Sequence, residues 1–310
     1  AGLGKESTLL VLHFTCGYLR FQRLLSGSCM MRPSSPKSPL HYAWIIVPTG
    51  TLVIFACLGF GRFALGMLLP SMASSLGLSY SQIGFISTGN FIGYLTAVLL
   101  CSPVASRIGS RRLIVIALLV IGGSMALVSR SSSFLSVLLL YMVTGMGSGA
   151  ANVPMMGLIT AWFDRTVRGR AAGFVVIGSG FAIIISGKLI PFINAAVGSE
   201  GWRTSWLVLA GIIALVAVVA VIFLRNRPAE MGLEPLGSEG KAPLAFVPAA
   251  QKHPSLYRNA SVYLLGIIYF LFGYTYVIYA TFIVTTLVKE RGLSESLAGN
   301  FWSWVGFLSL

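Results

Sequence analysis

S-P-V-A-S-R-I-G-S-R-R, from Ser102 to Arg112, is a short basic segment between two long apolar runs. The run from Ile83 to Cys101 and the run from Leu113 to Val128 contain no formally charged residue. Their lengths approach the roughly 20 residues that a helix needs to cross a bilayer. Basic residues in short loops between spans stay on the cytoplasmic side. The segment therefore predicts two spanning helices and fixes their orientation.

The composition excludes an ordinary water-soluble domain. Apolar residues make up 56% of the chain, charged residues 10%, and the mean hydropathy is +0.85, against about 45–50% apolar and about 25% charged residues in soluble domains. The net charge of +14 comes from Lys and Arg residues scattered between apolar runs. We therefore expect this chain to have a lipid bilayer as its partner, and no nucleic acid.

Apolar segments of spanning length recur along the chain and predict an all-α integral membrane protein. We expect an N-terminal tail at residues 1–40, a six-helix bundle at 41–224, a flexible cytoplasmic linker at 225–259 and the start of a second bundle at 260–310. The six expected spans are about Ala43 to Pro70, Ser81 to Ser102, Leu113 to Ser129, Phe134 to Trp162, Ala171 to Ala195 and Ser205 to Leu224. A seventh runs from about Ala260 to Val288, and an eighth begins near Ser296.

The tail and the loop charges bear on the start and the orientation of the chain. Met30 and Met31 precede a polar lead into the first span, so residues 1–29 are a candidate for a non-native extension. Most loop Arg and Lys residues fall on the side of the tail and the linker. By the positive-inside rule, the N-terminus is cytoplasmic. We expect a multi-pass protein of the cytoplasmic (inner) membrane.

Six spans, a long linker, further spans and a basic turn after the second span together resemble the major facilitator superfamily of secondary transporters. The family's turn motif is roughly G-x-L-A-D-R-x-G-R-R, and W-F-D-R-T-V-R-G-R-A-A-G at 162–173 is similar to its loop between spans four and five. The resemblance implies a gating role for Ser106, Arg107, Gly109, Arg111 and Arg112. Because Ser106 occupies the acidic position, we expect a gate held by hydrogen bonds and packing instead of an ion pair.

Two subgroups of the superfamily remain open. G-F-G-R-F-A-L-G-M-L-L-P in span one and G-N-F-I-G-Y-L in span two resemble the YbfB/YjiJ-like subgroup. R-N-R-P-A-E-M-G-L-E-P after span six is similar to oxalate/formate-type organic-anion exchangers. Tyr141 stands where many members have an Arg in span four. The resemblance also implies a complete first half and only the first one to two helices of a C-terminally truncated second half.

Arg62 is the first candidate for recognition of a substrate. It lies about 19 residues, or about 28 Å, into its span. An ionisable residue at such a depth marks a substrate or ion path, and the alternative is an Arg that snorkels to the interface. The other expected wall residues, which also suit hydrogen bonds between helices, are Asn90, Tyr94, Asn152 and Tyr274, with Tyr276 at similar depth. For Lys188 in span five, snorkelling is the favoured reading.

The positions of the acidic residues indicate the charge of the expected substrate. All eight lie in the tail, the loops or the loop edges, so the charges within the spans are positive. We therefore expect a transporter that moves a small organic anion by alternating access, with neither cofactor nor metal. The spans show no paired acids, nucleophile with base or metal-ligand set, which argues against an enzyme. A non-transporting sensor or scaffold remains the alternative from another class.

Overall fold

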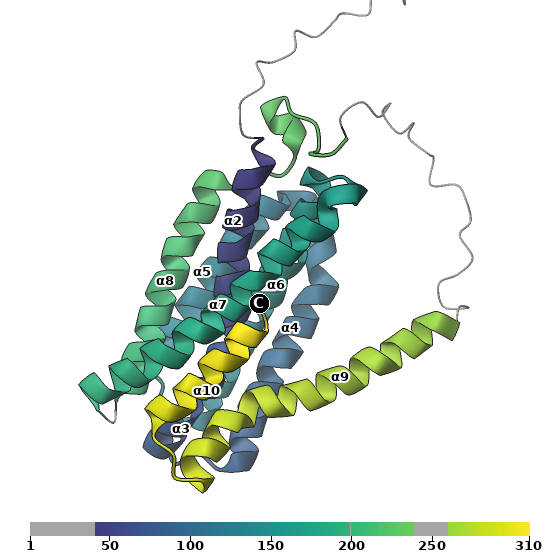
Figure 1. Ribbon diagram of the computed structural model, residues 1–310. Helices are drawn as coiled ribbons and strands as arrows, with labels where there is room; N and C mark the ends of the chain where they lie inside the picture. The colour runs from purple at the N-terminus through teal and green to yellow at the C-terminus, as the bar shows by residue number, and fades with distance from the viewer. Residues whose placement is uncertain (1–40, 199, 239–259) are drawn as a thin grey trace, which may run out of the picture. The chain divides into compact units, whose positions relative to one another are not determined.

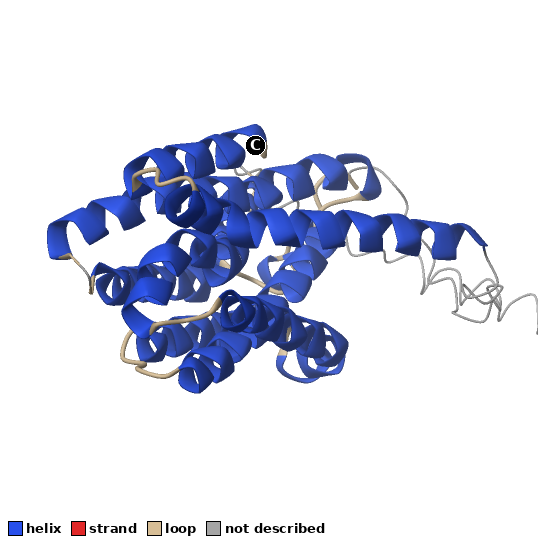
Figure 2. Cartoon of the chain, turned by 90° about the horizontal axis from the view of Figure 1, so that it is seen from below, coloured by secondary structure: helices blue, strands red, loops and turns tan. Residues whose placement is uncertain are grey.

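The computed structural model describes residues 41–198, 200–238 and 260–310, and the regular elements in these ranges are helices (Figures 1 and 2). They are α2 (Ala43–Ile54), η1 (Phe55–Phe63), α3 (Ala64–Leu76), α4 (Tyr80–Ile108), α5 (Ser110–Val128), α6 (Phe134–Trp162), α7 (Arg165–Val197), α8 (Gly201–Phe223), η2 (Pro228–Met231), α9 (Ala260–Thr285), η4 (Thr286–Glu290) and α10 (Glu295–Leu308). The expected all-α class is confirmed. The tail at residues 1–40, its proposed non-native part included, and residues 239–259 lie outside the described residues.

Within the described ranges, seven helical segments are long and apolar enough to cross a membrane. They are Ala43–Leu76, Tyr80–Ile108, Ser110–Val128, Phe134–Trp162, Arg165–Val197, Gly201–Phe223 and Ala260–Glu290. The first combines α2, η1 and α3 into one span, which is the most enclosed of the seven. α10, with 14 residues, occupies the place of the expected eighth span. The prediction of a multi-pass membrane protein is confirmed.

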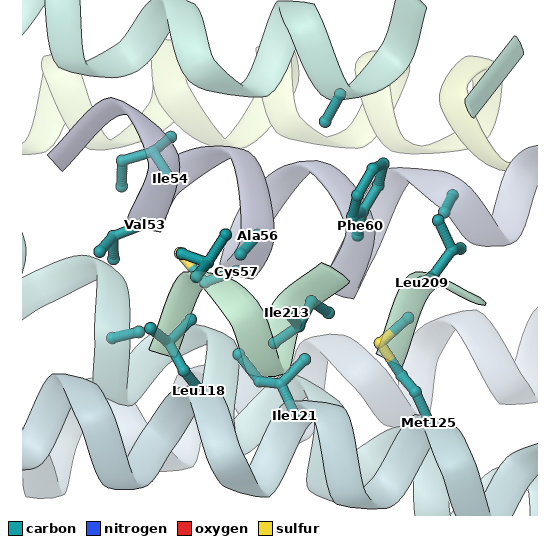
Figure 3. Packing of buried hydrophobic residues seen from close by; sticks show 14 of the residues in the cluster. Val53, Ile54, Ala56, Cys57, Phe60, Leu118, Ile121, Met125, Leu209 and Ile213 are labelled. Atoms are coloured by element: carbon teal, nitrogen blue, oxygen red, sulfur yellow. The ribbon is translucent and has the colours of Figure 1, made fainter. Parts of the chain in front are cut away.

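The first span lies in the core of the six-helix bundle. Figure 3 shows side chains of α2 and η1, such as Val53 and Phe60, above those of α5 and α8, such as Ile121 and Ile213. All four are buried. The outward faces of the other helices carry large exposed apolar side chains, for example Leu99 at 72% exposure. In a bilayer such faces meet lipid, so the helices are apolar all round.

Glycines bring the helices of the bundle into backbone contact. A Cβ atom at Gly147 would lie 2.6 Å from Ile121 Cγ1, and one at Gly149 would lie 2.6 Å from the Tyr94 carbonyl oxygen. Gly145 lies similarly close to the backbone of Asn90. These glycines are packing positions between α4, α5 and α6, as expected from their apolar context. The G-x-G-x-G sequence at 145–149 therefore marks close helix contacts.

The basic segment at 102–112 is almost wholly helical. α4 continues to Ile108, and α5 begins at Ser110. Gly109 alone, with a φ of +87°, reverses the chain. The expected 11-residue turn is therefore wrong in extent, because α4 continues beyond its apolar run into exposed positions such as Arg107. The next basic segment behaves alike, since α7 begins at Arg165 rather than near Ala171.

The two ends of the bundle differ in their connections. The linker end carries the beginnings of α2, α5 and α7 and residues 224–238, whereas the turn end carries the short connections at 77–79, 129–133 and 291–294. At the linker end, Leu236 exchanges backbone hydrogen bonds with Trp162 and Asp164, at 2.9 Å each. The indole of Trp162 also donates to the Arg225 carbonyl at 3.0 Å. The expectation of a flexible linker is therefore wrong for residues 225–238.

Candidate functional site

The centre of the first span is a π-helix, η1, that ends at Phe63, directly after Arg62. Side chains from two other helices donate to its last carbonyl oxygens. The Tyr141 hydroxyl of α6 donates to the Arg62 carbonyl at 3.0 Å, and Asn90 Nδ2 of α4 donates to the Gly61 carbonyl at 3.4 Å. π-helical segments often accompany functional sites because they displace the regular hydrogen-bond ladder. The two hydrogen bonds place the end of η1, and with it Arg62, between α4 and α6.

The guanidinium of Arg62 lies among aromatic rings. Its central carbon is 3.9 Å from the centre of the Phe91 ring, 5.4 Å from that of Tyr94 and 5.8 Å from that of Phe63. The ring faces attract a cation, and this attraction grows when water is excluded. The three ring centres thus lie within 6 Å of the guanidinium carbon and surround part of the cation. This set of Arg62, Phe63, Phe91 and Tyr94 is called the aromatic cage below.

A cavity of about 20 Å³ lies beside the aromatic cage, which is room for about one water-sized group. Its wall comes from the first span, α4, α6 and α9. The polar side chains in the wall are those of Arg62, Ser87, Asn90, Tyr141, Tyr276 and Thr281. The cavity therefore lies between the six-helix bundle and α9, the first helix after the linker. It combines one positive charge with hydroxyl and amide groups.

Two polar atoms of this wall are enclosed and have no hydrogen-bond partner. They are Nε of Arg62, which is a donor, and Oδ1 of Asn90, which is an acceptor. The Nη groups of Arg62 also make no hydrogen bond to the described residues, and no described carboxylate pairs with them. A buried polar group without a partner costs free energy on the order of 1–3 kcal/mol. The site is thus equipped for a ligand that supplies the missing partners.

The other sequence-predicted wall residues fall into two groups. Asn152 Nδ2 donates to the Tyr94 hydroxyl at 2.7 Å, which forms a polar layer about one helical turn from Asn90 towards the linker end. Tyr274 does not line the cavity, because its side chain is 63% exposed. Tyr276 lines it instead and packs edge-to-face on Phe63, at 6.1 Å between ring centres.

α9 meets the first bundle near its own C-terminal end. The Ser87 and Thr281 hydroxyls lie 3.0 Å apart, and a Cβ at Gly66 would lie 2.8 Å from the Ala280 carbonyl oxygen. The part of α9 before Tyr274 is largely exposed, and in Figure 1 that part extends away from the other helices. The contacts close the cavity on the side of the turn end.

Lys188 lies outside this cavity. Its exposed side chain on α7 donates to Asn300 Oδ1 of α10. Both residues border a groove of about 490 Å³ that Trp304 and Phe307 also line. The two intramembrane cations thus have different surroundings, since Arg62 lies in the aromatic cage and Lys188 lies at a helix edge.

One of the predicted gating residues, Arg111, is held by a residue that the sequence did not single out. Asn226 Oδ1 accepts a hydrogen bond of 2.8 Å from the Arg111 backbone N–H, and the Arg111 side chain donates to the Val221 carbonyl. Asn226 is in turn bonded to Glu230 at 3.2 Å. Ser106 donates only to Pro103 of its own helix, at 2.8 Å. Arg107 and Arg112 are exposed.

A polar cluster lies at the turn end. Asn194 Nδ2 of α7 donates to Glu295 Oε2 of α10 at 2.8 Å and to Ser71 Oγ of the first span at 3.2 Å. Nearby, Arg203 pairs with Glu200 and donates to the carbonyls of the 129–131 turn. These groups surround or adjoin a hollow of about 750 Å³. The cluster connects α10 to the first bundle.

Among the residues that the structure describes, no group of three or more His, Cys, Asp and Glu side chains has the proximity needed to hold a metal ion. Cys57 and Cys101 are buried and unpaired. The site therefore consists of a cation, aromatic rings and neutral hydrogen-bonding groups. A cation flanked by neutral hydrogen-bonding groups has the chemistry that pairs with an oxyanion.

Comparison with known proteins finds transport proteins of this architecture. The chain is 26% identical to the hexuronate transporter of Bacillus subtilis (strain 168), over 80% of this chain and 58% of that protein. It is 27% identical to the 4-hydroxybenzoate transporter PcaK of Pseudomonas aeruginosa, over 89% of this chain and 66% of that protein. It is 31% identical to the membrane sensor protein UhpC of Salmonella typhimurium, over 59% of this chain and 41% of that protein. The chain thus spans about half the length of these relatives.

A solved structure shares the fold. A bacterial homolog of the human lysosomal transporter Spinster, in an inward-facing and unoccupied conformation, superposes with a TM-score of 0.71 at 15% identity, over 87% of this chain and 60% of that one. The sequence model of the Major Facilitator Superfamily matches residues 51–310. The expected family, and with it the expectation of a non-enzymatic membrane protein of the transporter type, is confirmed. This chain belongs to the Major Facilitator Superfamily.

Proposed function

We propose that this chain provides the anion-recognising half of a secondary transporter for small organic anions. The observation that carries the proposal is the placement of Arg62 in the aromatic cage, beside a cavity and without a carboxylate partner among the described residues. A charged side chain at membrane depth costs at least about 2.5 kcal/mol and faces a pathway or a partner. An anionic ligand supplies that partner.

The chemistry of Arg62 favours a carboxylate or a similar oxyanion. A guanidinium offers parallel N–H donors that match the two oxygens of a carboxylate. The faces of Phe91 and Tyr94 orient the guanidinium and exclude water, which strengthens the interaction. Asn152 and Tyr94 form the next polar layer, so a ligand that enters from the linker end meets hydrogen-bonding groups before Arg62.

The relatives support this class of substrate. Hexuronate, 4-hydroxybenzoate and sulfoacetate appear in the names of three matched transporters, and each is an acid. The subgroup assignment stays a prediction, and an oxalate/formate-type exchanger falls within the same proposal. We also propose a cytoplasmic N-terminus in the inner membrane, because the linker end carries most loop Arg and Lys residues.

The contacts of α9 support alternating access. The bundle and α9 meet at Ser87 and Thr281, close to the turn end, while the part of α9 nearer the linker end is exposed. With a cytoplasmic linker, these contacts lie on the outer side of Arg62, so the access that we propose for this state is from the cytoplasm. Transporters of this type rock two bundles around a site near the midplane. The opposite opening requires α9 to separate from Gly66 and Ser87.

A second candidate is a sensor that binds an anion without moving it. The similarity to the membrane sensor protein UhpC favours it, at 31% identity over 185 residues. Both candidates use the same recognition site, because a sensor also needs selective binding. They differ in whether binding is followed by net movement of the ligand across the bilayer.

The test combines binding and flux in reconstituted vesicles. In vesicles that contain this half together with the second half of the transporter, radiolabelled small carboxylates should bind and be taken up, whereas neutral amides and amines of the same size should not. Arg62→Ala should reduce affinity at least tenfold and Arg62→Lys should restore only part of it, since Lys lacks the fork. Arg130→Ala, at an exposed turn, is the control. Arg62-dependent binding without uptake would identify a sensor, and preference for cations would refute the proposal.

A further inference from the structure

Arg62 and Asn90 both line the cavity, and each has one enclosed atom without a hydrogen-bond partner, a donor in Arg62 and an acceptor in Asn90. We infer that the site selects acids that carry a hydroxyl group next to the carboxylate, with the hydroxyl between Arg62 Nε and Asn90 Oδ1. This inference rests on the proposed function and narrows its substrate class. It depends on the orientation of the Asn90 amide, on the donor edge of Arg62 and on the size of the cavity.

The orientation of the Asn90 amide follows from its partners. Its Nδ2 group donates to two carbonyl oxygens, Tyr141 at 3.0 Å and Gly61 at 3.4 Å. Carbonyl oxygens only accept, so the amide nitrogen must face them and the amide oxygen must face the other way. Asn90 is 2% exposed, and its Oδ1 is enclosed without a donor. The cavity wall therefore presents one fixed acceptor that calls for a donor.

Arg62 presents the complementary groups. Nε is enclosed and has no acceptor, and the Nη groups make no hydrogen bond to the described residues. The Phe91 ring centre lies 3.9 Å from the guanidinium carbon, so the ring occupies that side of the cation. The Nη groups supply donors for the carboxylate of a ligand. Nε is then left for a second ligand atom that accepts a hydrogen bond.

One functional group can pair with both Arg62 Nε, which needs an acceptor, and Asn90 Oδ1, which needs a donor. A hydroxyl accepts from Nε of Arg62 and donates to Oδ1 of Asn90 at the same time. An ammonium group has no acceptor for Nε, and an ionised carboxylate has no donor for Oδ1. The cavity of about 20 Å³ holds one group of that size, which is the size of a hydroxyl or a water. Ser87 and Thr281 are already bonded to each other.

An acid without the hydroxyl must bind with a trapped water or with both atoms left unpaired. Sites that hydrogen-bond a substrate hydroxyl reject analogues that lack it, because buried polar groups then lose their partners. The inference is therefore tested with matched acids on the purified full chain in lipid nanodiscs. The pairs are glycolate with acetate, lactate with propionate, and mandelate with phenylacetate. Binding is measured by calorimetry or by displacement of a labelled acid.

We expect each hydroxy acid to bind at least about tenfold more tightly than its partner without the hydroxyl. Equal affinity within all three pairs, with binding that still depends on Arg62, overturns the hydroxyl inference and leaves the anion site intact. Binding that does not depend on Arg62 refutes the proposed function of the Arg62 site as well. The wild-type panel gives this answer even if no variant folds.

A variant locates the discrimination at Asn90. Asn90→Ala removes the acceptor, so the preference for lactate over propionate should fall to about twofold or less while propionate still binds through Arg62. Asn300→Ala removes an amide that bonds Lys188 outside the cavity, and it should leave the preference unchanged. A preference that survives in correctly folded Asn90→Ala would contradict the assigned role. Circular dichroism and size-exclusion profiles report whether the variants fold.

Discussion

The guanidinium carbon of Arg62 lies 3.9 Å from the centre of the Phe91 ring, inside the membrane-spanning part of the bundle. This stacking explains how a cation persists there without a carboxylate beside it among the described residues. The ring quadrupole compensates part of the lost hydration, and the free edge remains available for a ligand. Arg62 is thus poised for an anion by its neighbours as well as by its charge.

Phe91→Leu should weaken the binding of a small carboxylate by about twofold to thirtyfold, because a cation–π contact contributes about 0.5–2 kcal/mol. Phe85→Leu on the same helix is the matched control, since Phe85 is 62% exposed and borders no part of the cavity. Equilibrium binding of a labelled acid measures both. Equal losses in the two variants would argue against a cage effect.

Gly178→Ala should destabilise the bundle by about 1–3 kcal/mol, because the added methyl group meets the backbone of Thr51 in the first span. Gly173→Ala lies on the same helix in open space and should be neutral or stabilising by up to about 1 kcal/mol. Thermal unfolding in detergent compares the two. The pair separates close helix contact from the general effect of replacing glycine.

Asn226→Ala should lower stability by about 1–2 kcal/mol, since the Arg111 backbone N–H and Glu230 lose their partner. Ser106→Ala should change it by less than about 0.5 kcal/mol, because Ser106 is exposed and bonds only within α4. Unfolding curves of both variants test the expectation that hydrogen bonds hold the basic turn. A larger loss in Ser106→Ala than in Asn226→Ala would contradict the expectation that Asn226 holds the basic turn.

Asn194→Ala should loosen α10 from the first bundle, because it removes the hydrogen bond to the Glu295 carboxylate. In a background without the four native cysteines, a cysteine at Ala298, which is fully buried, should react with a maleimide at least severalfold faster. Thr275→Ala is the control, because the Thr275 hydroxyl bonds only within α9. Unchanged labelling in Asn194→Ala would mean that other contacts hold α10, such as the close approach of Gly187 on α7 to the Gly299 carbonyl oxygen.

The positions of the helices were largely predictable, and their ends were less so. Phe134–Trp162 was predicted to the residue, because Ser133 caps it and the apolar run is uninterrupted. At residues 102–112 the charges suggested a loop, yet the helix continues, since an exposed helix tolerates charge and only Gly109 adopts a positive φ. Asn226 carried no pattern that marks a partner for the basic turn, because its contact spans 115 residues of sequence.

The sequence by itself determined the all-α membrane class, the family, the spans and the depth of Arg62, because bilayer thickness and charge placement act along the chain. Only the tertiary structure decided which sides of the helices meet. Lipid-facing and core-facing sides are both apolar, so hydrophobic periodicity does not distinguish them. Tyr274 and Tyr276 lie about 200° apart around α9, and packing alone selects Tyr276 for the cavity. The same packing brings Asn90 and Tyr141 to the π-helix that carries Arg62.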